Sequence, residues 1–330
     1  MSKQGQLFQS ACLLVAGAIL GFAPGEARAQ ADYPNKPVRI ISDSSPGSAV
    51  DVGLRIIADG MTQHWKQQVV IVNQPGAAGA ISARVASQAA PDGYTLYAPA
   101  LSVFLAVPGK APNLPLMVPR DFMAVGYTVD QPLAIGVSPK LGIDTLAELI
   151  ALAKTKPGEL SYAVTGVGRL THLTGELLQL RTGIKLQMVP YSGNSSQAVA
   201  DVYAGRIPIM IEGYTGLAPA FQSGNLKALA VGSAQRLPSA PNLPTISETV
   251  PGLIASGWQA VLAPNGTPPA LIVKANEGLN AALNMPQVKD RLAGRGSFVR
   301  PMSPAEVSAF IKAQQDLWKP AIARIAEQMK

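Results

Sequence analysis

The sequence predicts an α/β fold in two lobes, each a mainly parallel sheet flanked by helices. Short apolar runs rich in β-branched residues alternate with amphipathic stretches along the chain. This alternation occurs in two series, which a proline-rich stretch at 108–119 separates. Turns rich in glycine, serine and other small residues join strands to helices in both series, as strand–turn–helix units require. Two such series in one chain indicate two lobes.

The first series begins with an apolar strand at Val38–Ile41. An amphipathic helix follows at Val52–Trp65, with apolar residues at helical spacing. Val69–Val72 is a continuous apolar run, which is typical of a parallel strand buried on both faces. A turn of small residues then opens a helix at Ile81–Ala90, and Tyr94–Tyr97 is the next strand.

The second series begins with two strands, Val125–Val129 and Leu133–Val137, which we expect on either side of Pro132. The elements after them again alternate. They are helices at Leu146–Lys154, Leu173–Arg181, Ala198–Ala204 and Leu217–Ser223, and strands at Leu160–Val164, Gln187–Tyr191, Ile207–Ile211 and Leu226–Val231. Ligands of open parallel sheets bind beyond the carboxyl ends of the strands, so a site between the two series is expected.

The last part of the chain returns to mixed structure. Residues 238–251 are rich in proline, serine and asparagine and indicate a surface loop. Trp258–Ala263 reads as a strand and Ala270–Leu283 as a helix. A terminal helix is expected at Val307–Met329, where Ser303 and Glu306 form a capping box and Pro320 introduces a kink.

Composition restricts the function further. The 330 residues are 48% hydrophobic and 14% charged, which is typical of a globular protein, and the formal net charge is +7. No run of lysine or arginine occurs, so nucleic acid is not an expected partner. A positive field favours anionic small molecules, although solubility alone would explain the charge equally well.

The first 29 residues resemble an export signal. Lys3 supplies a basic start, Leu7–Ala23 is mostly apolar, and Ala27–Ala29 has the small-x-small pattern of a cleavage site. The single cysteine, Cys12, lies inside this segment, so no disulfide or thiol chemistry is expected in the mature chain. We expect a protein exported to the periplasm.

Two turns carry the binding chemistry. One is Thr165–His172, between the strand at 160–164 and the helix after it, and the other is Ser44–Asp51, after the first strand. Each leaves backbone N–H groups at a helix start, where the helix dipole favours an anion. Arg169 adds a fork of donors that suits a carboxylate. The two turns are expected to face each other and to hold one small organic acid.

Enzyme functions are poorly supported. No G-x-S-x-G nucleophile turn occurs, and two histidines with no mature cysteine make a zinc site improbable. Gly166-Val167-Gly168 lacks the third glycine of a dinucleotide-binding turn, and Gly76–Gly79 does not fit a phosphate loop with lysine. No cofactor and no metal are therefore predicted, while a pair of catalytic carboxylates remains open.

Six short segments follow one another in order along the mature chain, at residues 33–39, 75–79, 91–96, 189–191, 226–231 and 263–268. Singly the segments are weak signals, but together they are specific. They resemble the periplasmic solute-binding proteins of tripartite tricarboxylate transporters, the Bug or TctC-like family.

The resemblance implies a two-lobed, type II-like periplasmic binding protein with a hinge and an interlobe cleft. Lobe 1 would comprise 30–130 and 236–330, and lobe 2 would comprise 131–235. The implied activity is capture of a carboxylate by a monomer and its delivery to membrane permease subunits. The ligand-binding residues that the resemblance implies are Ser45, Pro46, Gly47, Ser48, Asp51, Thr165, Gly166, Val167, Gly168 and Arg169. Further candidate ligand-binding residues are Gly79, Ala80, Ser102, Tyr191 and Tyr214.

The chain departs from the family pattern at several of these positions. Ser48 replaces the second of two usual glycines, and Arg169 stands where small hydroxyl residues are common. Ser48 could cap its helix instead of binding a ligand. Asp51 would repel an anion, so helix capping or a contact through water is the expected role. His172 is interpreted as structural.

The ligand class stays open. Aromatic dicarboxylates such as terephthalate are plausible because Arg169 is accompanied by Tyr191, Tyr214 and Trp258, which could stack on a ring. Tricarboxylates, aliphatic dicarboxylates and nicotinate-like acids fit almost as well. Two alternative functions remain, namely a receptor that presents its ligand to a sensor kinase and a secreted hydrolase.

Overall fold

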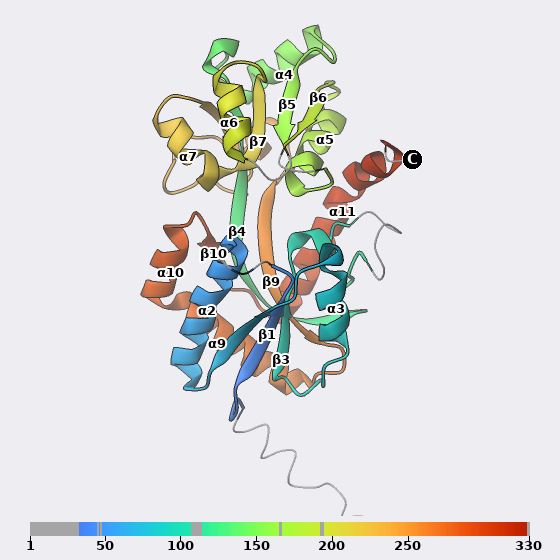
Figure 1. Ribbon diagram of the computed structural model, residues 1–330, viewed down its shortest axis with the longest axis vertical. Coiled ribbons are helices and arrows are strands. Elements are labelled where there is room, and N and C mark those ends of the chain that lie inside the picture. Colours follow the sequence, from blue (N-terminus) through green and yellow to red (C-terminus); the bar gives the residue numbers. More distant parts are fainter. Residues whose placement is uncertain are drawn as a thin grey trace, which may run out of the picture.

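The computed structural model describes residues 33–44, 46, 48–106, 114–164, 167–191 and 195–328. The export signal lies outside these residues, as do Ser45, Gly47, Thr165 and Gly166. Within the described part, ten strands join in one mixed sheet, with the order β2-β1-β3-β9-β4-β7-β5-β6 and with β10 and β8 also paired to β4. Helices flank both ends of this sheet (Figure 1).

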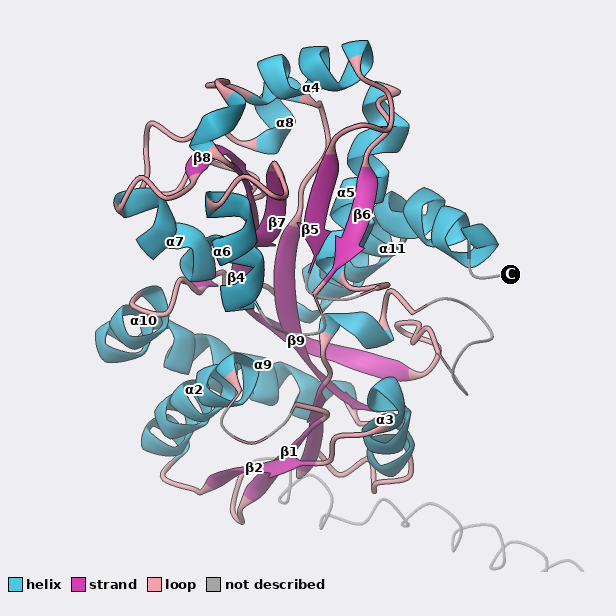
Figure 2. Cartoon of the chain, turned by 45° about the horizontal axis from the view of Figure 1, so that its top comes forward, coloured by secondary structure: helices cyan, strands magenta, loops and turns pink. Residues whose placement is uncertain are grey.

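The first strand–turn–helix series forms one half of the molecule. Strand β1 (Val38–Ser42) lies between β2 (Val69–Asn73) and β3 (Thr95–Ala98), and both pairings are parallel. The carboxyl ends of the three strands therefore lie at the same edge. Helices α2 (Ala49–Trp65) and α3 (Ala80–Ser87) follow β1 and β2, and both lie beside the strands in Figure 2.

The second series forms the other half. Strand β5 (Ser161–Val164) lies between β6 (Gln187–Pro190) and β7 (Ile209–Gly213), again with parallel pairings. The helices that follow these strands are α5 (Leu170–Thr182), α6 (Ser195–Tyr203) and α7 (Tyr214–Gln222). Figure 1 shows β1 running up toward the middle of the molecule and β5 running down toward it.

One strand, β4 (Phe122–Val137), runs through both halves, whereas the sequence suggested two strands around Pro132. β4 pairs antiparallel with β9 (Ser256–Pro264) as far as Pro132 and with β7 from Leu133 onward. Proline has no N–H to donate. Pro132 lies after Asp130, the last residue of β4 that pairs with β10, and before Leu133, the first that pairs with β7. The strand therefore continues through it without losing a ladder bond.

This change of pairing lies close to the predicted boundary between the lobes at 130 and 131. Strand β8 (Lys227–Val231) also pairs with the second half of β4, and β10 (Phe298–Val299) pairs with its first half. The assignment of the remaining residues to lobes stays a prediction.

The two faces of the sheet in the first half are covered by different helices. Val125, Val129 and Val261 point to the core that contains α2 and α9 (Pro269–Asn284). Tyr127, Trp258 and Leu262 point to the other face, where α11 (Pro304–Gln328) lies. The ring of Phe310 on α11 packs edge-on against Tyr127 and Trp258. Val125, Tyr127 and Val129 are two residues apart but do not all face the same way, because the register with β9 shifts between Ala124 and Gly126 and between Tyr127 and Val129.

Several short elements were not expected from the sequence. The loop at 238–251 contains a one-turn helix, α8 (Ile246–Thr249), and α10 (Pro286–Ala293) follows α9. The helices α4 (Leu146–Thr155) and α11 lie where they were expected. The predicted capping box of α11 forms, because Ser303 Oγ accepts from Glu306 N and a Glu306 carboxylate oxygen accepts from Ser303 N. Among the helices described, none is long and apolar enough to cross a bilayer.

Candidate functional site

The loops at the carboxyl ends of β1, β2 and β3 come together in the first half. Ser48 is the N-cap of α2, and its hydroxyl accepts from Asp51 N at 3.2 Å, so it has the capping role that was its alternative interpretation. The helix itself supplies no acceptor for the N–H groups of Ala49 and Val50. These two amides are the donors that α2 leaves for an anion.

Asp51 is engaged within the protein. Its side chain is 2% exposed, and the carboxylate accepts from Arg55 Nε at 2.9 Å and from Asn73 Nδ2 at 2.8 Å. Asn73 is the last residue of β2, so this carboxylate fastens the start of α2 to the neighbouring strand. The geometry supports positioning of the turn, and contact with the ligand through water or through a donor group of the ligand stays a prediction.

Asp43, the first residue after β1, was not identified from the sequence. Its Oδ1 accepts from Ala100 N at 2.8 Å, which joins the loops after β1 and β3. Burial raises the pKa of this carboxyl, although the bond from Ala100 opposes that shift. The sequence contained a signal for this residue. An acidic side chain directly after a predicted parallel strand lies at the edge of the sheet where ligands bind.

Gly79 lies where the loops after β1, β2 and β3 meet. It has a φ of +94°, and a Cβ at this position would lie 2.3 Å from Val103 Cγ1 and 2.6 Å from Asp43 Oδ2. Ala80 begins α3 directly after it, while Ser102 is exposed in the short helix Leu101–Val103. The structure thus brings Gly79 and Ala80 close to Asp43, and Pro46 is exposed in the first turn.

This crowding gives a stability prediction. Gly79→Ala should lower the free energy of unfolding by about 1–3 kcal/mol, because the added methyl meets both neighbours and the backbone is left-handed. The matched control is Gly142→Ala, whose φ is +68° but whose Cβ would have no neighbour within 4 Å. Urea denaturation of both variants measures the difference. Equal losses would show that backbone strain alone matters.

The second turn, between β5 and α5, presents a different set of donors. Arg169 is the N-cap of α5 and is exposed, and its side chain makes no hydrogen bond or ion pair within the described part of the chain. The first helical bond runs from Leu173 N to Arg169 O, so α5 supplies no acceptor for the three amides before Leu173. Val167 is also exposed. This turn therefore offers a guanidinium and helix amides.

The amide of Gly168 is not one of these donors. It donates to His172 Nδ1 at 3.0 Å, so the turn itself uses an N–H group that the sequence assigned to the ligand. His172 is 2% exposed, and its Nε2 lies 3.7 Å from Glu176 Oε1. The interpretation of His172 as structural agrees with this geometry.

Glu176 ties this region to the C-terminal helix. Its carboxylate accepts from Gln179 Nε2 at 3.1 Å and pairs with Arg324 Nε of α11 at 2.7 Å. Burial alone would raise the pKa of Glu176, but the bond from His172 and the charge of Arg324 outweigh it and leave the pKa lowered. The buried carboxylate of Glu176 thus fastens α5, which begins at Leu170, to α11.

The two predicted tyrosines lie beside this turn, one after β6 and one after β7. The Tyr191 hydroxyl donates to Asp201 Oδ2 at 2.5 Å, and burial together with this bond raises its pKa to about 12. Tyr214 begins α7 and is half-buried near Phe221. Trp258 is 4% exposed and packs between Phe104 and Phe310, which removes it from the rim of this site.

Comparisons with known proteins identify the family of this chain. Residues 54–326 match the tripartite tricarboxylate transporter family receptor, TctC. The chain belongs to this family. It is 36% identical to protein BugT of Bordetella pertussis over 96% of this chain and 98% of that protein. A UPF0065 protein of Bordetella bronchiseptica is 34% identical over 92% of this chain and 89% of that protein.

Solved structures share the fold. A TctC solute-binding protein from Polaromonas without ligand has a TM-score of 0.78 at 25% identity, with 88% of this chain and 99% of that chain covered. Rpa4515 of R. palustris, solved with adipate, has a TM-score of 0.70 at 29% identity, covering 89% and 98%. MatC from Rhodopseudomonas palustris, with bound malate, scores 0.67 at 26% identity, covering 88% and 100%. The two-lobed α/β fold expected from the sequence is confirmed.

Proposed function

We propose that the protein is a periplasmic solute-binding receptor that captures an organic dicarboxylate between its two halves and delivers it to a tripartite-type membrane permease. One observation supports this proposal most directly. In a chain of the TctC family, the helices α2 and α5 begin at the carboxyl ends of two sets of parallel strands. Adipate and malate, bound by two relatives, are both dicarboxylates.

The geometry suggests a role for each group. Arg169 would pair with one carboxylate through its fork of donors, and the amides at the start of α5 would add hydrogen bonds to the same group. The amides of Ala49 and Val50 at the start of α2 would take the other carboxylate. Closure of the halves would then exclude water around the bound acid. No covalent bond is made or broken in this process.

The finer ligand assignment rests on the tyrosines. Tyr191 has its hydroxyl engaged by Asp201, which leaves the ring as its free surface, and Tyr214 stands at the next strand end. Rings at these positions could stack on an aromatic dicarboxylate such as terephthalate. Aliphatic acids would instead leave the rings to pack against a methylene chain.

A thermal-shift panel tests the proposal. Adipate, malate, terephthalate, citrate and nicotinate would each be added to the mature protein, with adipamide as the uncharged control. An acid present at one hundred times its dissociation constant should stabilise the protein by about 2.7 kcal/mol. Adipamide should have no effect. Absence of a shift with every acid would contradict the proposal.

A further inference from the structure

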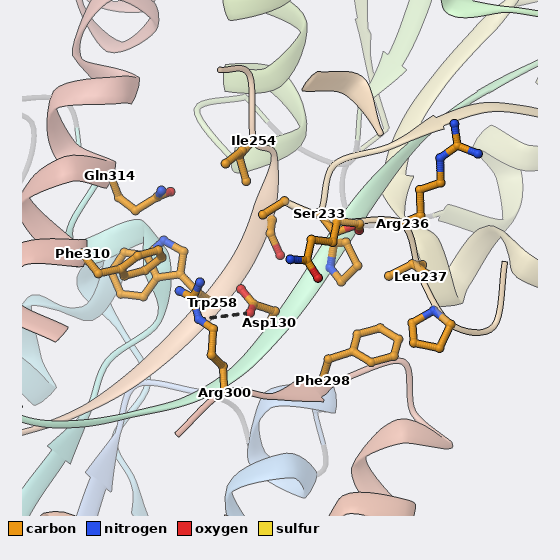
Figure 3. Close-up of a pocket in the computed structure, with 15 residues that line it drawn as sticks. Asp130, Ser233, Arg236, Leu237, Ile254, Trp258, Phe298, Arg300, Phe310 and Gln314 are labelled. Carbon is orange, nitrogen blue, oxygen red and sulfur yellow. Dashed lines mark hydrogen bonds and ion pairs between the residues drawn. The ribbon is translucent and has the colours of Figure 1, made fainter. Parts of the chain in front are cut away.

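A cavity of about 390 Å³ lies beside the strands that connect the two halves (Figure 3). It is built from β4, the loop after β8, β9, β10 and α11. Its lining comprises Asp130, Pro132, Ser233, Ala234, Gln235, Arg236, Leu237, Pro238, Ile254, Ser256, Trp258, Phe298, Arg300, Phe310 and Gln314. None of these residues belongs to the two turns assigned to the carboxylate.

The pairing register places this cavity away from α5. Asp130 lies opposite Trp258 of β9 and Phe298 of β10, and residues directly opposite each other point to the same face of a sheet. Gln131 and Gly257 alternate to the other face. On that face a Cβ at Gly257 would lie 4.0 Å from Leu170, the first residue of α5. The connecting strands therefore separate the cavity from the second turn.

Aromatic side chains form much of the wall. Trp258 and Phe310 pack at a centroid distance of 5.3 Å with an interplanar angle of 78°, and Phe298 stands on the adjacent strand (Figure 3). Leu237 and Ile254 add aliphatic surface. A wall of this kind suits a flat aromatic ligand, since ring edges and faces attract one another.

The charges around the cavity are balanced. Arg300 pairs with Asp130 at 3.6 Å and stacks over the Phe310 ring at 4.7 Å. Arg236 pairs with Glu248. Each cation thus has its own carboxylate, so the lining favours an uncharged ligand over an ion.

One buried donor on the wall, Trp258 Nε1, lacks a hydrogen-bond acceptor within the described residues. Arg300 Nε and Nη2 also make no hydrogen bond there, but Nε is the atom that pairs with Asp130 at 3.6 Å. A buried donor without an acceptor is costly, and native proteins rarely leave one unsatisfied. Trp258 is 4% exposed, and solvent therefore has little access to its N–H. An acceptor oxygen in the cavity that reaches Trp258 Nε1 would satisfy this donor.

We propose that this cavity is a second small-molecule site, for a compact uncharged aromatic molecule that carries one carbonyl-type acceptor. The aromatic wall favours a ligand with an aromatic ring, and the paired charges favour a ligand without a net charge. The indole N–H without an acceptor favours a ligand with a carbonyl-type oxygen. This site is independent of the carboxylate receptor function.

Benzamide is the probe, and calorimetric titration of the full mature protein is the measurement. We expect saturable binding of one benzamide per chain. Trp258→Phe keeps the ring but removes the N–H donor and should weaken binding about tenfold. Ala234→Trp places a bulky ring at the wall and should abolish binding. Trp65→Phe and Ala151→Trp, at positions outside the lining, are the matched controls and should bind as the unmodified protein does.

Two further ligands test the class. Toluene lacks the acceptor and benzoate carries a charge, so both should bind more weakly than benzamide at this site. Absence of benzamide binding, as expected if water alone satisfies the donors, would overturn the proposal. Binding that survives both Ala234→Trp and Trp258→Phe would also overturn it, because the ligand would then lie elsewhere.

The same variants separate this proposal from the receptor function. Both cavity variants should keep the thermal shifts that dicarboxylates produce, because Trp258 points to the face opposite Leu170 and neither position belongs to the two turns assigned to the carboxylate. A protein that responds to dicarboxylates but not to benzamide would refute only the second site. A protein that binds benzamide but no dicarboxylate would refute only the receptor function.

Discussion

Replacing Arg169 with alanine is expected to weaken dicarboxylate binding about 10-fold to 100-fold while leaving the fold intact. A hydrogen bond to a charged group is worth about 1.5–3 kcal/mol, and the guanidinium can form two with one carboxylate. The side chain is exposed and forms no internal bond within the described residues, so its removal should not unfold the protein. Titration of the best acid from the panel measures the change.

The control for this prediction lies on the same helix. Arg181 is an exposed arginine in the last turn of α5, so Arg181→Ala removes the same charge about three turns away from the site. Its affinity should remain within twofold of the unmodified protein. If both variants weaken binding equally, Arg169 acts on affinity through long-range electrostatics and not through direct contact with the ligand. If neither does, Arg169 is not a ligand residue.

Replacing Glu176 with alanine should lower the free energy of unfolding by about 3 kcal/mol. The change removes the acceptor of Gln179 and the partner of His172 and Arg324, all in a region where Glu176 is 3% exposed. Buried groups that lose their partner retain the cost of desolvation. Chemical denaturation at pH 7 measures the loss, and Glu159→Ala, at an exposed position, should change stability by under about 0.5 kcal/mol.

The pH dependence gives a second check on Glu176. Its folded-state pKa is lowered from the ordinary value of 4.5, so its contribution is complete above about pH 5 and is lost as the pH falls through the folded-state pKa. The stability gap between the unmodified protein and Glu176→Gln should therefore be constant near neutrality and shrink in acid. A gap that grows on acidification would contradict an ionised, paired Glu176.

Local patterns in the sequence were sufficient for most strands and helices. The strand β5 and the helix α5 were predicted because an apolar run, a glycine turn and a second apolar run follow one another. The start of α5 was placed three residues late, because Leu170, Thr171 and His172 do not stand out from the preceding turn in apolar periodicity. The helix α8 was missed although Thr245 and Glu248 form a capping box, since it has only one turn.

Features made from distant segments were beyond sequence reasoning. The strand β4 was predicted to break at Pro132 because proline has no N–H to donate. A missing N–H weakens a strand only where a neighbouring strand offers an acceptor for it, and the neighbours here, residues 213 and 256–258, are distant in the sequence. The bond from Gly168 to His172 depends on the side-chain direction in the first helical turn. The aromatic cavity joins residues from 130 to 314 and has no local signature.

The course of β4 also limits how the gene could be divided. Its first half supplies hydrogen-bonding partners to β9 and β10, and its second half supplies them to β7 and β8. A fragment cut at the junction would expose an unpaired strand edge in each half, and such edges promote aggregation. The N-terminal fragment would lack β9 and β10, and the C-terminal fragment would lack the first half of β4, so two separately expressed fragments should be insoluble.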